Sequence, residues 1–359
     1  MGDGNNGAGS GAPGRVLRGT AWTLTVTVTV CVLAVGYLYH RLNGNLTGID
    51  INGALGRDRP RNVDNGSLDI LVLGSDSRAG DNGGYGGGDK NSARSDTAMV
   101  VHVYQGHRRA TVVSIPRDTL VKRPACTATH GGHTARGAAR AMFNTAYEIG
   151  GPACAVKTVE AMTGIRMDHY LEIDFSGFRK LVDKIGGVDI TTTEAIHDKK
   201  SHLDLKAGRH HLDGKQALGL VRTRHGVGDG SDLGRIRLQQ AFLKALLDRV
   251  RAVDLLGSPT KLYDLADTST KALTTDSELA SVGRLLGFAR GLKGVDSDRT
   301  RMVTLPVRYD PANPNRVVPI DSRADEVWRA LRADRQVPRT ATKGSAGDGL
   351  GVTQVVRRS

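Results

Sequence analysis

Hydrophobic and polar positions divide the chain into one long uncharged segment near the N-terminus and a later region of short elements. Gly19 to Tyr39 contains no charged residue, and about 20 such residues suffice for a helix to cross a bilayer. Trp22 lies near one end and Tyr37 near the other, where aromatic rings favour the membrane interface. We therefore predict a transmembrane helix over residues 19–39, with a cleaved signal peptide as the alternative.

The segments outside this helix and the later domain are polar. Residues 1–18 and 336–359 are predicted to be disordered tails, the first of them cytoplasmic, and residues 40–66 a linker. Basic residues lie on both sides of the helix, so the positive-inside rule hardly decides its orientation. A short N-terminal tail before a large domain favours a single-pass membrane protein whose domain, residues 67–335, is extracytoplasmic.

Short strand and helix patterns alternate within residues 67–335. Leu68–Leu73 is an apolar run ending at a glycine, as in a buried strand, and Thr97–Tyr104 and Ala110–Ile115 predict a β-hairpin. Helical patterns include 136–150, 153–164, 176–187, 232–250, 277–292 and 324–334, and further strands are predicted at 169–175, 188–193 and 301–307. Residues 212–224 are predicted to form a short helix that runs into a loop or strand. This order predicts a single α/β domain with a mixed central β-sheet flanked by helices.

The composition favours an anionic partner. The formal net charge is +13, which suits nucleic acid, a membrane surface, a phosphorylated lipid or an acidic polymer. Aromatic residues make up only 4%, which disfavours a single-strand nucleic-acid site built on base stacking. Outside the membrane segment the cysteines are Cys126 and Cys154, which predict one disulfide, with two separate buried thiols as the alternative.

Charged residues gather at the predicted ends of the strands. Asp76 and Asp96 lie at the end and the start of two strands, with a glycine-rich loop between them. Such a carboxylate pair is typical of a site for a hard cation, although aspartates are also common caps and turn residues. Arg78 and Arg94 flank the same loop, and Arg117 follows the end of the hairpin.

Further arginines lie in the segment just before the predicted helix 232–250 and within that helix. Arg222 and Arg224 would face the same side of an extended segment. On the helix, spacings of four and three residues pair Arg235 with Gln239 and Arg237 with Gln240. Because guanidinium groups bind phosphate in a bidentate manner, the cluster predicts an anionic ligand. For any single arginine, a solvated surface position is the alternative. The chain has no GxxxxGK, GxSxG or HExxH motif.

These motifs together resemble those of the LytR-CpsA-Psr proteins. The segments "LVLGSDSR", "ARSDTAMVVHV", "TVVSIPRDT", "HLDGKQALGLVRTRH" and "DLGRIRLQQAFLKAL" occur in the family's order over Leu68 to Val250. The high content of alanine, glycine, arginine and valine is similar to that of actinobacterial members.

The resemblance implies a membrane-anchored, magnesium- or manganese-dependent phosphotransferase. Such an enzyme moves a glycopolymer from a polyprenyl-pyrophosphate lipid carrier to peptidoglycan, usually to the C6 hydroxyl of N-acetylmuramic acid. Its partners are then the carrier, peptidoglycan and the membrane, with no nucleic acid. Two alternatives stay open: a pyrophosphatase acting on the same carrier, and a membrane-bound transcriptional attenuator. An inactive polymer-binding scaffold is a third.

The resemblance also assigns roles to residues. It places the metal ligands at Asp76 and Asp96, and the catalytic candidates are Arg117, Arg222, Arg224, Asp118 and Asp232, one of the last two accepting the hydroxyl proton. Pyrophosphate-binding candidates are Arg78, Arg94, Arg117, Arg222, Arg224, Arg235, Arg237, Gln239 and Gln240. Leu238 stands where the family often has an arginine. An apolar tunnel for the prenyl chain would be lined by Phe175, Phe178, Leu181, Val182 and Ile185, for which core packing is the alternative.

Overall fold

The computed structural model describes residues 13–57, 59–75, 95–129, 132–224, 230–253, 258–346 and 356–357. It divides into two compact units, Met1–Gly44 and Asn45–Ser359. The described part of the first unit is one helix, α1 (Pro13–Gly44). Its segment Thr25–Gly44 is long and apolar enough to cross a membrane. A single-pass anchor therefore fits this helix, which begins earlier and ends later than the predicted span of 19–39.

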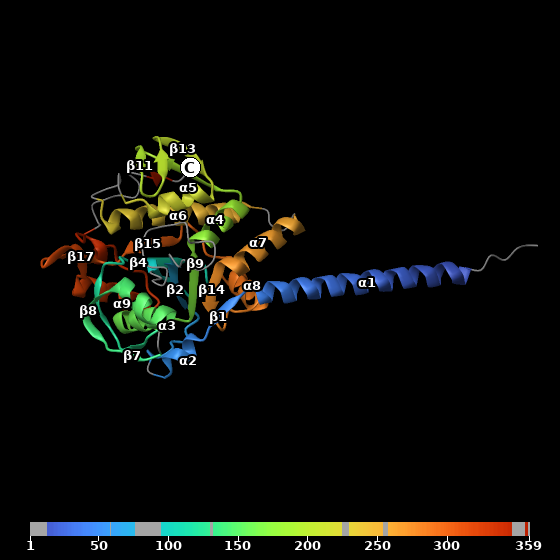
Figure 1. Cartoon of the computed structure of the whole chain (residues 1–359), viewed down its shortest axis with the longest axis horizontal. Helices are drawn as coiled ribbons and strands as arrows, with labels where there is room; N and C mark the ends of the chain where they lie inside the picture. The colour runs from blue at the N-terminus through green and yellow to red at the C-terminus, as the bar shows by residue number, and fades with distance from the viewer. Residues whose placement is uncertain are drawn as a thin grey trace, which may run out of the picture. The chain divides into compact units, whose positions relative to one another are not determined.

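A seven-stranded mixed sheet forms the centre of the second unit (Figure 1). Its order is β1-β14-β9-β2-β3-β4-β15, and the neighbours pair in both parallel and antiparallel directions. Antiparallel pairing of β3 with β4 confirms the predicted hairpin. The strands are β1 (Thr47–Ile49), β2 (Leu68–Ser75), β3 (Ser95–Val103), β4 (Ala110–Ile115), β9 (His169–Asp174), β14 (Leu273–Asp276) and β15 (Thr300–Thr304).

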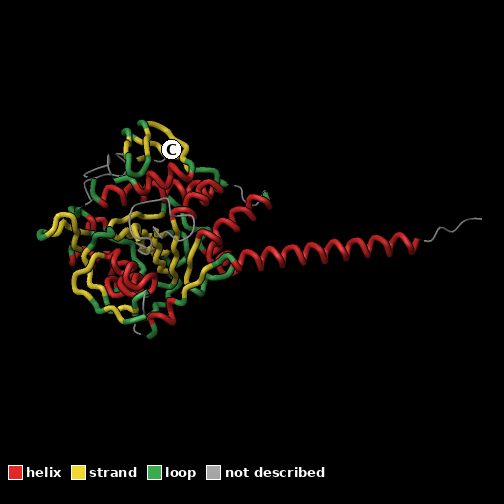
Figure 2. Tube along the Cα trace, in the orientation of Figure 1, coloured by secondary structure: helices red, strands yellow, loops and turns green. Residues whose placement is uncertain are grey.

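Helices lie on both sides of this sheet (Figure 2). Along β2 the side chains alternate between the two faces. Leu71 and Leu73 belong to the largest core cluster, together with residues of α3 (Phe143–Thr163) and α9 (Asp321–Arg332). Ile70 belongs to another cluster, against which Phe288 of α8 (Val282–Gly291) packs. The predicted α/β sheet flanked by helices is therefore confirmed.

A second core cluster joins three helices to a group of short strands. The helices are α4 (Phe175–Lys184), α5 (Gly214–Arg222) and α6 (Asp232–Ala252), and the strands are β10 (Val188–Thr192), β11 (Ile196–Asp198), β12 (Leu203–Leu205) and β13 (Gly208–Leu212). Val182 and Ile185, two candidate tunnel residues, are buried in it, and Phe178 packs against it. In the described structure these three side chains contribute to core packing, which was the alternative reading of them.

The remaining elements surround these layers. The helical ones are α2 (Ile51–Leu55), α7 (Pro259–Ala272) and the 3-10 turn η2 (Arg339–Thr342). The strands are β5 (Leu120–Arg123), β6 (Cys126–Thr127), β7 (Thr134–Ala135), β8 (Ala138–Met142), β16 (Val307–Asp310), β17 (Asn313–Pro319) and β18 (Val356–Arg357). A disulfide joins Cys126 of β6 to Cys154 of α3, 28 residues apart.

Two predicted segments differ from the structure. Residues 138–142 are predicted as helix but form β8, because Met142 and its neighbours pair with β5 across a long sequence separation. The helix then starts at Phe143, and it breaks at Gly150 and Gly151, where the sequence predicted a stop. A left-handed Gly164 ends it, with φ of 64°, at the end of the predicted segment 153–164.

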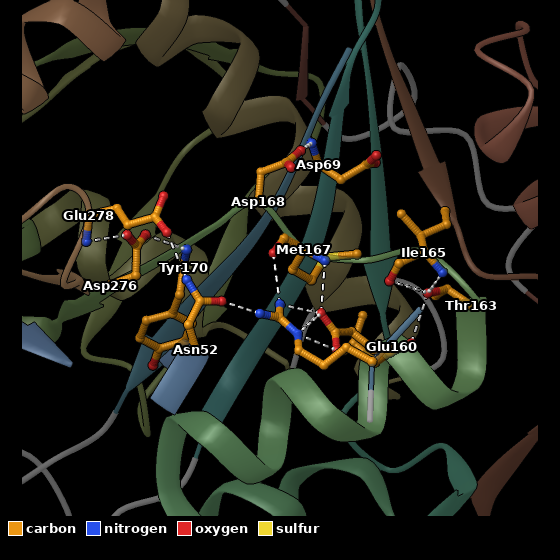
Figure 3. A network of polar contacts seen from close by, with 12 residues as sticks. Asn52, Asp69, Glu160, Thr163, Ile165, Met167, Asp168, Tyr170, Asp276 and Glu278 are labelled. Atoms are coloured by element: carbon orange, nitrogen blue, oxygen red, sulfur yellow. Dashed lines mark hydrogen bonds and ion pairs between the residues drawn. The ribbon is translucent and has the colours of Figure 1, made fainter. Parts of the chain in front are cut away.

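Residues 40–66, predicted as a linker, contain elements of the second unit. β1 pairs in parallel with β14 at the edge of the sheet, and α2 follows it. The side chain of Arg59 is buried and pairs with Glu160 of α3. In Figure 3 the carboxylate of Glu160 also accepts a hydrogen bond from the backbone of Met167, at 2.9 Å. Residues 45–57 and 59–66 are therefore part of the folded domain, because their partners come from distant parts of the chain.

Candidate functional site

The predicted charged residues meet where several elements end near one another. Asp96 lies at the start of β3, Arg117 follows the end of β4, and Arg224 follows α5. Asp232 and Arg235 lie in the first turn of α6. Because β3 and β4 are antiparallel neighbours, the start of one and the end of the other lie at the same end of the sheet.

A compact network joins four of these side chains. Nη1 of Arg117 donates to Oδ1 of Asp96, and the guanidinium of Arg235 pairs with Oδ1 of Asp232. Nη2 of Arg235 donates to the backbone oxygen of Asp96 at 2.7 Å. The backbone N–H of Arg117 donates to Oδ2 of Asp232 at 3.2 Å. The two acids thus fix the orientation of the two arginines.

The charges in this network shift the pKa values of its members. Burial acts against the charged form of Asp96, but the guanidinium groups of Arg235 and Arg117 outweigh it and lower the pKa of the carboxyl. Burial acts to lower the pKa of Arg117. The carboxylates of Asp96, Asp232 and Asp118 outweigh burial and raise this pKa. Asp96 and Arg117 therefore both remain charged over the physiological pH range.

Arg224 lies in a net positive environment. Burial, followed by repulsion from Arg235 and Arg117, lowers its pKa despite the nearby carboxylates. The backbone of Arg224 is held by Asp198, whose Oδ2 accepts its N–H at 3.0 Å. An arginine that is fixed in place while other cations repel it is suited to bind an anion.

A hollow of about 220 Å³, here called the first hollow, opens beside these groups. Its described lining consists of Asp96, Asp198, Lys200, Ser201, Arg222, Arg224 and Arg235. Within this lining the basic side chains outnumber the acidic ones by four to two. The guanidinium of Arg222 lies over the ring of Phe175, 4.8 Å from its centroid. Cation–π stacking of this kind orients the group.

A second hollow of about 310 Å³ adjoins the first along Arg224, which lines both. Its described lining consists of Pro116, Arg117, Asp118, Arg224, Gly230, Ser231, Asp232, Leu233, Tyr309, Pro314, Asn315, Arg316 and Val317. Asp118 lies 3.7 Å from Nε of Arg117 and 3.5 Å from Nη1 of Arg316. All five catalytic candidates, namely Arg117, Arg222, Arg224, Asp118 and Asp232, therefore line one or both hollows.

Three of the predicted substrate-binding residues do not line either hollow. Nε2 of Gln239 donates to Thr97 and to the backbone oxygen of Val221, each at 2.9 Å. Nε2 of Gln240 donates to Ser114 at 3.0 Å and to Thr304 at 3.3 Å. Arg237 is 8% exposed. The two glutamines instead fasten α6 to the sheet, because their amide groups meet polar side chains of β3, β4 and β15.

Some predicted residues lie outside the described part of the chain, and others were missed. Asp76, Arg78 and Arg94 belong to the first group. No sequence pattern indicated Lys200, Ser201 and their neighbour Asp198 of the first hollow. The same holds for the residues of β16 and β17 in the second, namely Tyr309, Asn315 and Arg316. The sequence signals were weak, since short polar turns and single exposed aromatics are common on any surface.

The family of the chain follows from its similarity to known proteins. The model of the LytR_cpsA_psr family matches residues 38–333. The chain belongs to this family. Its curated relatives include the cell wall biosynthesis protein LcpA of Corynebacterium glutamicum, which is 31% identical over 78% of this chain and 58% of its own length. The matched part thus spans little more than half of that relative.

Two further comparisons concern TagT. The Bacillus subtilis polyisoprenyl-teichoic acid–peptidoglycan teichoic acid transferase TagT is 32% identical over 64% of this chain and 66% of its own length. A solved structure of TagT bound to LI-WTA superposes with a TM-score of 0.57 and 25% identity. That comparison covers 80% of this LytR-CpsA-Psr chain and 98% of the TagT chain. The solved relative therefore shares the fold of the domain.

Proposed function

We propose that this protein transfers a glycopolymer from a polyprenyl-pyrophosphate carrier to peptidoglycan, at the C6 hydroxyl of N-acetylmuramic acid. One observation carries the proposal: the first hollow gathers Lys200, Arg222, Arg224 and Arg235 from separate segments around a space with fewer acids than bases. Such a space suits a diphosphate, whose oxygens several guanidinium groups can contact together. The name of the relative TagT, a teichoic acid transferase, gives the reaction class.

A divalent cation fits the acid at the edge of the first hollow. Carboxylate oxygens are the ligands that Mg²⁺ and Mn²⁺ prefer, usually with phosphate oxygens and water. Arg117 contacts Oδ1 of Asp96, whose side chain is part of the lining of the first hollow. Asp76, the other proposed ligand, lies outside the described residues. When bound, the ion supplies positive charge that neutralises the phosphates.

The chemistry of this transfer is mainly positioning and charge stabilisation. The acceptor hydroxyl oxygen bonds to the sugar-linked phosphorus, the bond from that phosphorus to the bridging oxygen breaks, and polyprenyl phosphate leaves. Arg222 and Arg224 bind the phosphates and stabilise the charge that develops on the leaving group.

A carboxylate accepts the proton of the attacking hydroxyl. Both oxygens of Asp232 are engaged, Oδ1 with Arg235 and Oδ2 with the backbone of Arg117. Asp118 has ion pairs of 3.5 Å and longer and lines the second hollow. Asp118 is therefore the better placed of the two to take this proton.

An assay with a defined donor tests the proposal. Full-length protein in detergent is given a polyprenyl-pyrophosphate-linked glycan and Mg²⁺, with and without a peptidoglycan glycan strand. Polyprenyl phosphate release that depends on Mg²⁺, with polymer becoming attached to the strand, is the expected result. Equal release without the strand, and no attached polymer, would instead identify a pyrophosphatase. No release under any condition would exclude both enzymes.

A further inference from the structure

The second hollow has a chemistry different from that of the first. It is bounded on one side by the start of α6 and on the other by the hairpin of β16 and β17. Tyr309 of that hairpin is 41% exposed, although it is a large aromatic residue. Asn315, Asp118 and Asp232 add hydrogen-bonding groups to the same lining. Arg117, Arg224 and Arg316 also line this hollow, so it differs from the first by its exposed aromatic ring and its amide side chain.

The hairpin is fixed relative to the charged site. Val317 forms a parallel β-bridge with Thr119, and its N–H donates to the backbone oxygen of Asp118 at 3.4 Å. Arg316 lies 3.5 Å from the carboxylate of the same aspartate. Tyr309 pairs directly with Val317 in the hairpin register. The aromatic ring is thus carried by a strand whose partner strand contacts the segment that contains Arg117.

The two hollows adjoin, so that a donor bound in one and an acceptor bound in the other would lie next to each other, as a transfer reaction requires. Arg224 lines both, and Arg117 of the second hollow contacts Asp96 of the first. In phosphoryl transfer the attacking and leaving oxygens lie roughly in line on opposite sides of the phosphorus. If a diphosphate occupies the first hollow, the attacking oxygen can approach the phosphorus through the second hollow, from the other side of Arg224.

The lining of the second hollow suits a sugar ring. One face of a pyranose carries C–H groups that pack against an aromatic ring, while its hydroxyls need hydrogen-bond partners around the edge. Tyr309 supplies the ring, and Asn315 and Asp118 supply polar partners. The volume of about 310 Å³ lies at the lower end of the roughly 300–1,000 Å³ common for small-ligand sites.

We propose that the second hollow is the acceptor subsite, in which one pyranose ring of a peptidoglycan glycan strand packs against Tyr309. The inference rests on the proposed function, and it names the place from which the acceptor hydroxyl approaches. Asp118, in the same hollow, would then lie beside the hydroxyl whose proton it takes. Because Tyr309 and Asn315 belong to β16 and β17, acceptor choice would depend on this hairpin.

Binding of a soluble probe tests this subsite without relying on turnover. The probe is a tetrasaccharide of alternating N-acetylglucosamine and N-acetylmuramic acid, titrated calorimetrically into the full chain in detergent. Tyr309→Ala is expected to weaken binding roughly tenfold, since it removes the packing surface, while Tyr309→Phe retains it. Arg308→Ala is the matched control, because Arg308 is the exposed neighbour on the same strand and does not line the hollow.

Each outcome bears on the assignment. Equal affinity of wild type and Tyr309→Ala for the tetrasaccharide would overturn it, and so would an absence of binding to the wild type. A raised KM for the donor in Tyr309→Ala, with unchanged tetrasaccharide affinity, would place the first sugar of the donor in the hollow and also overturn it. Release of polyprenyl phosphate by the wild type is measured separately. A result that rejects this subsite therefore does not by itself reject the proposed function.

Discussion

Single residues at the site differ in how their charge is balanced. Arg117 and Arg235 contact carboxylates directly, whereas the pKa of Arg224 is lowered by burial and by the other two arginines. The folded chain therefore holds Arg224 against repulsion. A residue that lowers the stability of its own protein in this way is expected to contribute to ligand binding instead.

Replacement of Arg224 separates these two roles. Arg224→Ala is expected to lower donor turnover about 100-fold or more, since one charge-stabilising group is removed. The melting temperature should stay unchanged or rise, because the burial of the Arg224 charge and its repulsion by Arg235 and Arg117 are both removed. The check is donor cleavage together with calorimetry, with Arg290→Ala as the charge-matched control on the exposed face of α8. A lowered melting temperature with normal turnover would contradict the assigned role.

A histidine far from the hollows links two layers of the domain. His102 of β3 is 1% exposed, and its two ring nitrogens contact Asp69 at 2.8 Å and Asp334 at 3.0 Å. Burial favours the neutral ring, but the hydrogen bonds and charges of both aspartates raise the pKa of His102. The imidazolium ties the end of α9 to β2 and β3.

This contact makes stability depend on pH. The stabilisation is fully present below the unfolded-state pKa near 6.5 and is lost as the pH rises through the raised pKa of the folded state. The free energy of unfolding should therefore fall above about pH 6.5. His102→Gln should cost about 2 kcal/mol at pH 6 and flatten the profile. Denaturant titrations at several pH values test this, with exposed His133→Gln as the control. An unchanged profile in His102→Gln would refute it.

Helix α6 shows how an element can be predicted correctly while its buried face is not. The spacing of Ile236, Leu243, Leu246, Leu247 and Val250 predicts one buried face, yet Val250 is 45% exposed. The first turns of α6 are instead buried on several sides, and Arg235, Gln239 and Gln240 are all within this buried part. Their polar groups find partners on the sheet, which the helical periodicity alone cannot reveal.

A buried ion pair helps to hold the segment before β2 to the domain. Nε of Arg59 donates to the carboxylate of Glu160 at 3.0 and 3.1 Å, and Nη2 donates to the backbone oxygen of Met167 at 3.0 Å. The two charged side chains are only 2% and 3% exposed. Loss of one partner would leave the other charge buried without compensation.

Substitution of Arg59 measures this attachment. Arg59→Ala should lower the free energy of unfolding by about 3–5 kcal/mol, because Glu160 stays buried. The double change Arg59→Met with Glu160→Leu should cost clearly less, since no lone charge remains. Exposed Arg61→Ala is the matched control, with a change below about 0.5 kcal/mol. If Arg59→Ala behaved like that control, the ion pair would not contribute to holding this segment to the domain.

At the scale of the whole molecule, the proposed acceptor determines on which side of the cytoplasmic membrane the domain must lie. Peptidoglycan lies outside the cytoplasmic membrane, and α1 contains a segment able to cross that membrane. A domain that follows α1 can reach such an acceptor only if the N-terminal end of α1 faces the cytoplasm. Basic residues flank the span on both sides, so this orientation depends on the function proposed.

A topology reporter tests this orientation. A phosphatase that is active only outside the membrane, fused after Ser359, should give activity in whole cells. A reporter that is active only in the cytoplasm, fused at the same place, should give none and serves as the paired control. A cytoplasmic signal would contradict both the orientation and the transferase, and would favour the regulatory alternative.

The sequence by itself determined the apolar helix, the β3–β4 hairpin, most of the longer helices and the identity of the arginine-rich motifs. Those features depend on local periodicity and turn chemistry, which a chain carries in its order of residues. Only the tertiary structure decided that Ala138–Met142 is a strand, that β1 joins the sheet and that Gln239 and Gln240 face inward. It also brought the hairpin of Tyr309 beside Arg117. Each of these depends on contacts between residues far apart in the chain, which no local pattern encodes.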